Sequence, residues 1–401
     1  IRSITYGNNQ FNAVGNRVTI LTSPDGAEWT ARSPRTKEWL RSATYGNNQF
    51  IAVGDRGTIL ISSDGAFWTT RSSGTTDNLK SITYGNNRFI ALNDRGKIFN
   101  SPDGTIWFRR FFTTTKSLCS VTYANNQFFM VGSDGTILTS PNGVTWTERS
   151  SGTKSLLYSA THGNNQFIVV GSDGTILTSS DGVTWTERSS GTTKSLCSVT
   201  YGNNQFIVVG SDGTILTSSD GATWTERSLG TTTWFKSVTY GNNQFIVVGS
   251  DGTILTSSDG ATWTERSSGT TKSLCSVTYD HNQFIAVGSE ATILSSKADA
   301  TTGIIISNLD SKITHPLSIT KVSNRLFIHT PNTRHVGKDL RISLFNTLGR
   351  TVFTTKLKIK IMARKFNIPI SGLSQLSCGI YHARITNGKD FEYCGSIAIT
   401  R

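Results

Sequence analysis

Hydrophobic and polar residues alternate in short blocks over the first three quarters of the chain. Residues 198–227 read SVTYGNNQFIVVGSDGTILTSSDGATWTER and hold four segments rich in β-branched and aromatic residues: SVTY, QFIVVG, TILTS and TWTER. That composition favours β-strands. The intervening GNN, SDG and SDG supply residues that tolerate positive φ in tight turns. Because connections this short join only antiparallel neighbours, the pattern predicts a four-stranded meander.

The meander recurs with a period of 39 residues. A longer connection, such as residues 189–196, leads from each fourth strand to the next first strand. Repeated meanders linked in this way are typical of the blades of a β-propeller, whereas a parallel solenoid would lack the hairpin turns. The period is marked by one aromatic position, occupied by Tyr6, Tyr45, Tyr84, Tyr123, His162, Tyr201, Tyr240 and Tyr279.

The number of blades depends on the last repeat. Seven repeats are complete, and the eighth has Thr302 where the period requires a tryptophan. Residues 302–306 still offer a degenerate fourth strand in the same register. We therefore predict an all-β chain whose residues 1–307 form an eight-bladed propeller; seven blades with an appended hairpin is the alternative.

The charge is concentrated behind the repeats. The 401 residues carry a formal charge of +13, and residues 298–401 alone hold 15 Lys and Arg against 5 Asp and Glu, a net +10. Lysines alternate with apolar residues in 355–361, which suits a solvated strand face or contact with an anionic partner. No aromatic-studded nucleic-acid motif accompanies them, so we do not expect nucleic-acid binding. No run of 18 apolar residues predicts a membrane helix, and we expect that any export signal has been removed.

Residues 308–401 form a second segment with seven short strand-like stretches, which suggests a small immunoglobulin-like β-sandwich. The stretch 342–350 (ISLFNTLGR), then Gly372-Leu373, then 379–384 (GIYHAR) and a terminal strand resemble the C-terminal sorting domain of type IX secretion cargo. The resemblance implies export across the outer membrane of a Bacteroidota-like bacterium by the type IX machinery. The motif residues are Leu348, Gly349, Arg350, Gly379 and Tyr381. Cys378 and Cys394 depart from that pattern, and their pairing, like removal or retention of the segment, stays open.

The turn before each repeat tryptophan resembles the Asp-box of sialidase-type propellers, one residue shorter than usual. In residues 218–224 it reads SSDGATW. The resemblance implies a structural role, in which Asp and Ser bond turn amides while Trp packs between blades. The residues concerned are Asp25, Trp29, Asp64, Trp68, Asp103, Trp107, Trp146, Asp181, Trp185, Asp220, Trp224, Asp259 and Trp263.

Strand alternation places the GNN and box turns on one rim and the central SDG turns and long connections on the other. The second rim varies between repeats. Trp39 and Trp234 share one repeat position on it, and Phe111 and Phe112 interrupt another polar connection. Such aromatic residues can stack on sugars or anchor a partner, unless they fold over a blade edge. They are the predicted ligand-binding residues.

Catalytic and metal-binding residues are not expected. The aspartates of the SDG turns could ligate calcium but suit turn formation better. Cys119, Cys197 and Cys275 recur two repeats apart, too far for disulfides, and lack metal-site companions. No arginine cluster with a paired Tyr and acid indicates sialidase catalysis. We therefore expect a non-enzymatic secreted or cell-surface propeller, without cofactors, that binds glycans or surface proteins. The alternatives are a subunit of a surface layer or filament, built from copies of itself, and a sialidase-like hydrolase.

Overall fold

The structure is a computed structural model. It describes residues 1–16, 19–32, 36–110, 116–227 and 229–299, with side chains up to residue 296, and beyond them the backbone of the strands between 303 and 399. Contacts divide the chain into two compact units, Ile1–Glu28 with Ser33–Ser311, and Trp29–Arg32 with Lys312–Arg401. Residues 29–32 fall in the second unit because they pair in parallel with a strand at Ile313–Thr314. The boundary that we place between residues 307 and 308 stays a prediction.

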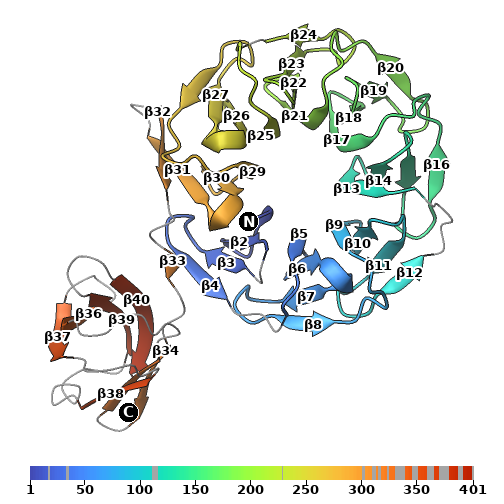
Figure 1. Cartoon of the computed structure of the whole chain (residues 1–401). Coiled ribbons are helices and arrows are strands. Elements are labelled where there is room, and N and C mark those ends of the chain that lie inside the picture. The colour runs from blue at the N-terminus through green and yellow to red at the C-terminus, as the bar shows by residue number, and fades with distance from the viewer. Residues whose placement is uncertain are drawn as a thin grey trace. The chain divides into compact units, whose positions relative to one another are not determined.

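Eight sheets, each built from four consecutive antiparallel strands, follow one another along the chain and stand as the blades of a ring in Figure 1. The first sheet also has the strand at Ile313–Thr314 as a fifth member. The predicted eight-bladed propeller is therefore confirmed. The first four blades consist of β1 (Ser3–Gly7), β2 (Gln10–Val14), β3 (Ile20–Ser23), β4 (Trp29–Arg32); β5 (Leu40–Gly46), β6 (Gln49–Gly54), β7 (Ile59–Ser62), β8 (Thr69–Arg71); β9 (Leu79–Gly85), β10 (Arg88–Asn93), β11 (Ile98–Ser101), β12 (Phe108–Arg110); and β13 (Leu118–Ala124), β14 (Gln127–Gly132), β15 (Ile137–Ser140), β16 (Thr147–Arg149).

The other four blades repeat this order, and short 3-10 turns occur at Asp55–Gly57, Ser250–Gly252 and Ser289–Ala291. The innermost strand of each blade is the first one, as Figure 1 shows for β5, β9 and β13. The strands are β17 (Leu157–Gly163), β18 (Gln166–Gly171), β19 (Ile176–Ser179), β20 (Thr186–Arg188); β21 (Leu196–Gly202), β22 (Gln205–Gly210), β23 (Ile215–Ser218), β24 (Thr225–Glu226); β25 (Phe235–Gly241), β26 (Gln244–Gly249), β27 (Ile254–Ser257), β28 (Thr264–Arg266); and β29 (Leu274–Asp280), β30 (Gln283–Gly288), β31 (Ile293–Asp299), β32 (Gly303–Asn308).

The turns take the conformations that their residues favour. Both asparagines of each GNN hairpin have positive φ, as at Asn203 (46°) and Asn204 (56°). Such φ values at both central positions belong to the tight hairpin turn that follows the twist of the strands. The SDG turns likewise hold their aspartate at positive φ, as at Asp212 (50°). Local sequence therefore sets the strand ends and the antiparallel order.

The core lies between neighbouring blades. Ile207, Val209 and Ile215 of one blade pack with Phe235, Phe245 and Trp263 of the next in one buried cluster. At Gly202 the first strands of two blades approach closely, because a Cβ there would lie 2.1 Å from Cγ of Tyr240; blades four and eight have Ala124 and Asp280 at this position. Each blade thus lacks a complete core of its own and depends on its neighbour, as in other repeat architectures.

The ring closes through a contact that also joins several other pairs of neighbouring blades. The side-chain amide Nε2 of Gln205 donates to the main-chain oxygen of Asp259 in the next blade at 2.8 Å. Nε2 of Gln283 in the eighth blade makes the equivalent bond to Asp25 in the first. Each of the eight blades takes its four strands from one continuous stretch of chain.

The eighth blade departs from the predicted register. A fourth strand exists at β32, as expected, but Leu294 pairs with Asn308. Its equivalent Leu255 pairs with Glu265, which predicts Ile304 as the partner of Leu294. The pairing is four residues later because β31 is longer than other third strands and turns sharply at Asp299 and Gly303. The prediction of an unchanged register was wrong.

The described strands of the second unit form two sheets. One has the order β34 (Ser318–Val322), β35 (Arg325–His329), β38 (Lys365–Pro369), and the other β37 (Thr351–Lys358), β36 (Asp339–Phe345), β39 (Gly379–Thr386), β40 (Glu392–Ile399). The strand preceding them, β33 (Ile313–Thr314), pairs with β4. Gly379 pairs with Ile399 and Arg384 with Cys394. Cys378 lies outside the described residues, and the immunoglobulin-like sandwich stays a prediction.

Candidate functional site

The propeller has two faces, which differ in how they are built. The box face carries the GNN hairpins and the Ser-x-Asp-Gly turns, and Nδ2 of Asn203 joins the two by a 3.3 Å bond to the main-chain oxygen of Ser258. The channel face carries the SDG turns and the long connections. A Cβ on Gly57 of one such turn would lie 2.0 Å from the main-chain oxygen of Thr75 in the following connection. The two predicted rims are thus both formed.

The box turns are held by their own side chains. Oδ1 of Asp220 accepts bonds from the backbone N–H groups of Ala222 and Thr223, both at 2.8 Å, and from Oγ of Ser218 at 3.0 Å. These N–H donors, that of Thr223 first, hold the carboxyl pKa of Asp220 at about 2. In the fourth blade Asn142 takes the place of the aspartate and accepts the same two backbone bonds.

The box tryptophans lie against the blades. Trp68, Trp146, Trp185 and Trp263 are buried, and Trp29 is completely so. The indole N–H of Trp68 donates to the main-chain oxygen of Gly65 at 2.8 Å. Trp107 and Trp224 are partly buried and pack on the same kind of interblade cluster. An indole held in this way is not available to an external ligand.

A cavity of about 970 Å³ lies at the centre of the ring, because residues from six of the eight blades line it. One position near the start of each first strand supplies most of its inner ring: Arg2, Arg41, Lys80, Cys119, Lys236 and Cys275. The period places Tyr158 and Cys197 at that position in the two remaining blades. We call these eight residues the inner ring.

The cations of the inner ring differ in their partners. Arg41 forms a two-bond ion pair with the carboxylate of Asp55. Nε of Arg2 donates to Oδ1 of Asn16 at 2.6 Å, and the ammonium groups of Lys80 and Lys236 donate to serine hydroxyls at 3.5 and 2.6 Å. Among the described residues, no ion pair joins Arg2, Lys80 or Lys236 to a carboxylate.

The thiols of the inner ring are free and partly buried, as expected. Burial raises the pKa of the Cys119 thiol, against an opposing effect of the Lys80 charge. A raised thiol pKa keeps Cys119 protonated and weakly nucleophilic near neutral pH. Cys119 and Cys275 line the cavity, and Cys119 contributes polarisable surface there rather than a reactive group.

The two variable tryptophans reach the inner ring. Trp39 lines the cavity, is 41% exposed, and lies with its ring centroid 5.6 Å from the guanidinium carbon of Arg2. Trp234 is 52% exposed; its ring centroid lies 5.7 Å from the Lys236 ammonium, and its N–H donates to the Cys197 sulfur at 3.1 Å. Both indoles are thus held by inner-ring residues while keeping exposed surface. Phe111 and Phe112 lie outside the described residues.

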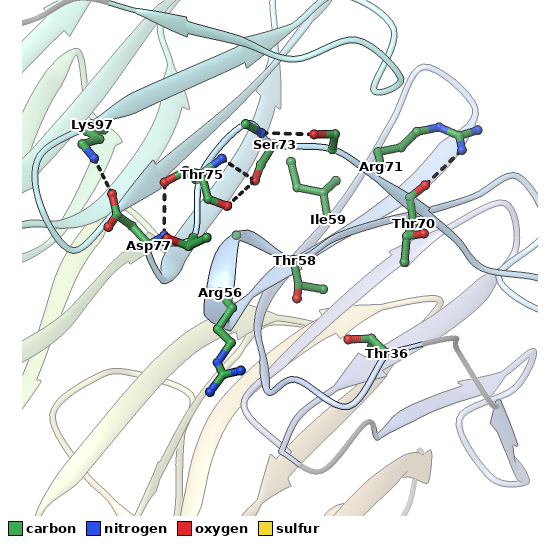
Figure 2. Close-up of a pocket in the computed structure, with 14 residues that line it drawn as sticks. Thr36, Arg56, Thr58, Ile59, Thr70, Arg71, Ser73, Thr75, Asp77 and Lys97 are labelled. Atoms are coloured by element: carbon green, nitrogen blue, oxygen red, sulfur yellow. Dashed lines mark hydrogen bonds and ion pairs between the residues drawn. The ribbon is translucent and has the colours of Figure 1, made fainter.

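A smaller hollow recurs beside individual blades on the channel face. Figure 2 shows the one of about 590 Å³ at Arg56, where Asp77 bonds the Lys97 ammonium at 2.5 Å and the Ser73 hydroxyl bonds the main chain of Thr75. Equivalent hollows lie at Gly174 and Gly252. Since they recur with the repeat, they follow from turn and connection geometry. Within the described residues, no group of three or more His, Cys, Asp or Glu could hold a metal ion.

Two of the five sorting-motif residues lie in a described strand. Gly379 and Tyr381 begin β39 at the edge of its pairing with β40, and Tyr381 pairs with Ile397. Leu348, Gly349 and Arg350 lie outside the described residues. Among the described residues, no helix is long and apolar enough to cross a membrane.

The comparisons with family models identify both parts of the chain. Residues 110–189 and 199–314 match the DUF6242 beta propeller domain, and residues 322–399 match the secretion system C-terminal sorting domain. The chain therefore carries a β-propeller domain followed by a type IX sorting domain. That tail indicates secretion by the type IX system, outside the cell or on the cell surface of a Bacteroidota-type bacterium, and handling by the secretion machinery. The likeness of the box turns to sialidase-type Asp-boxes stays a resemblance.

Solved structures share the propeller fold at low sequence identity. They include YCF48 bound to D1 peptide (17% identity, 66% of this chain and 93% of that chain, TM-score 0.53) and the computationally designed Ika8 protein (13%, 74% and 95%, 0.62). BamB from Moraxella catarrhalis matches similarly (12%, 74% and 94%, 0.58). At these identities the likeness concerns the fold alone. No curated protein matches the chain.

The sequence indicated the two tryptophans but not the inner ring. At one repeat position Arg2, Arg41, Lys80 and Lys236 stand where other repeats have Cys119, Cys197 and Cys275. The available signal was that a single position varies between cationic, aromatic and thiol side chains in otherwise similar repeats. Strand periodicity shows which face a residue takes, but its approach to residues of other blades requires the closed ring.

Proposed function

We propose that this protein is a non-enzymatic extracellular binding module that takes glycans or partner proteins at its channel face. The observation that carries the proposal is the position of Trp39 and Trp234, half-exposed and each against an inner-ring cation. Exposed indoles beside a cavity offer flat apolar surface for sugar rings or for a protein anchor. The solved complex of YCF48 with a peptide supports the idea that a propeller of this shape can hold a ligand.

We further propose that the box residues are structural. Their carboxylates accept hydrogen bonds from turn amides, and their indoles pack between blades. Eight similar blades with this turn chemistry build the ring, and recognition is left to the channel face. In this assignment neither face supplies a nucleophile or a general acid, and the sorting domain provides export or attachment.

Binding to an immobilised glycan array and to extracellular protein extracts tests the proposal. The purified chain should bind a defined class of ligand, and the double substitution Trp39→Ala with Trp234→Ala should abolish that binding without changing the unfolding midpoint. Trp224→Ala, which lies in a box turn, is the matched control and should lower stability instead. Binding that survives the double substitution would contradict the proposed site, and turnover of sialosides or other glycosides would contradict the non-enzymatic assignment.

The assembly of copies into a layer or filament is the alternative. Native mass spectrometry of the purified chain separates the two functions, because a strict monomer that binds a ligand supports the binding module. Regular oligomers without ligand binding would favour the structural subunit.

A further inference from the structure

The channel face is divided by charge into two sectors. At the central position of the SDG turn, the first three blades carry arginine and the other five carry acids. The residues are Arg17, Arg56 and Arg95 against Asp134, Asp173, Asp212, Asp251 and Glu290. One position of the fourth strand also changes between the third and fourth blades. The first three blades carry Ala31, Thr70 and Arg109 there, and the next four carry Glu148, Glu187, Glu226 and Glu265.

The inner ring follows the same division. Its first three members are Arg2, Arg41 and Lys80, and the next three, Cys119, Tyr158 and Cys197, are uncharged. Lys236 adds a cation from the seventh blade to the same cavity. In blades one to three the inner-ring position is cationic, the turn position is arginine, and the fourth-strand position carries no acid. We call these three blades the basic sector.

Turn chemistry does not account for the arginines. Arg56 has φ of 50°, as Asp212 has in the sixth blade. Aspartate tolerates this left-handed conformation better than residues with long side chains, because its short polar group bonds locally. Arg56 is therefore the less suitable residue for the turn. Its side chain is 78% exposed and lies 3.9 Å from the carboxylate of Glu38, and Arg95 lies 3.3 Å from that of Asp77.

Charge neutralisation within the cavity is incomplete. The charge of Arg41 is offset by Asp55, and Glu290, which also lines the cavity, pairs with Lys272 at 2.7 Å. Arg2, Lys80 and Lys236 donate hydrogen bonds to neutral oxygens, and Arg2 and Lys236 also lie over the Trp39 and Trp234 rings; among the described residues no carboxylate pairs with them. Cations that converge on a concave surface focus a positive potential there and attract anionic ligands.

We propose that the central cavity binds an acidic oligosaccharide, a chain of uronic acids whose carboxylates lie on Arg2, Lys80 and Lys236. The exposed indole of Trp39 packs on a sugar ring, which distinguishes this ligand from a simple anion. Carboxylates spaced along a sugar chain match cations supplied by separate blades, and lysine and arginine form charge-assisted bonds with carboxylates. This inference rests on the proposed binding function and names its site and ligand class.

Isothermal titration of the full chain with tetragalacturonate tests the proposal, with neutral cellotetraose and the peptide tetraglutamate as comparisons. Tetragalacturonate should bind most tightly, and its affinity should fall as salt is raised. The double substitution Lys80→Ala with Lys236→Ala should weaken binding by about tenfold or more, because each substitution removes a charge-assisted bond to a ligand carboxylate. Lys194→Ala is the matched control; this lysine pairs with Asp212 in the acidic sector, and its removal should leave affinity unchanged.

Each other outcome overturns the proposal in a recognisable way. Tighter binding of tetraglutamate would assign the cavity to an acidic peptide. Equal binding of cellotetraose, lost with Trp39→Ala, would keep the proposed glycan-binding function and remove the role of the basic sector. Absence of binding by all three ligands to a chain with an unchanged unfolding midpoint would reject the cavity as the site. Binding on a glycan array would then show whether the proposed function fails too.

Discussion

The box face and the channel face come from the same repeats but obey different constraints. On the box face, side chains bond the turn that contains them or the neighbouring blade, as Asp220 and Gln205 do. On the channel face, the equivalent turn position accepts arginine in one blade and aspartate in another with the same φ. A position whose side chain is not needed by the fold is free to change its chemistry. The comparison teaches that side chains that stabilise turns gather on the box face, while side-chain chemistry varies between blades on the channel face.

Acidification should give the largest loss of stability, because it protonates the aspartates of several box turns together. Backbone N–H donors hold the pKa values of Asp181, Asp220 and Asp259 at about 2, below the ordinary 3.8. A carboxyl with a lowered folded-state pKa contributes stability that is complete above about pH 4 and is lost as the pH falls toward 2. Urea midpoints measured by tryptophan fluorescence should therefore drop steeply between pH 4 and 2. A chain with Asp→Asn at these three positions should lose less, since Asn142 already accepts the same bonds in the fourth blade.

Gly202→Ala should give the next largest effect. Its new methyl group would meet the Tyr240 ring at 2.1 Å, and that ring is held against Phe245 with centroids 4.6 Å apart. Overpacking of this kind costs about 2 kcal/mol. Gly191→Ala on the channel face is the control, because nothing lies within 4 Å and only its φ of 73° opposes the change, at about 1 kcal/mol. Equal losses of unfolding free energy would refute the role of the blade contact.

Aspartates within one blade give the smallest and most direct comparison. Asp220→Ala removes the acceptor of two backbone N–H groups and should lower the unfolding free energy by about 1 kcal/mol. Asp212→Asn on the channel face removes only a half-exposed ion pair with Lys194 and should change stability by less than about 0.5 kcal/mol. A larger effect at Asp212 would show that the channel face also supports the fold.

Local residue types predicted most of the fold. The paired asparagines and the SDG turns fix hairpins through their tolerance of positive φ, and the period then gives the blades and their number. The eighth blade was predicted with the wrong register because β32 pairs with an extended β31, and no turn residue in the repeat pattern signals that extension.

The candidate site was predictable only in part. Trp39 and Trp234 are conspicuous because they stand on polar connections, and their neighbours Arg2 and Lys236 lie close enough to be found once the strands are built. Arg2, Lys80 and Lys236 line one cavity only because the ring of blades closes, since these residues are up to six blades apart in the chain. Periodicity relates equivalent positions but does not state that they face a common space.

The closure of the ring by Gln283 and Asp25 has an evolutionary consequence. The four antiparallel strands of each blade are encoded by one uninterrupted segment of the gene, and the first sheet adds β33 beside β4. Unequal recombination between nearly identical copies can then add or delete a whole blade while leaving all remaining sheets intact. Such an event would change the bore of the ring and the number of groups around it in a single step. This architecture lets the lineage alter the diameter of the ring faster than substitution at individual residues would allow.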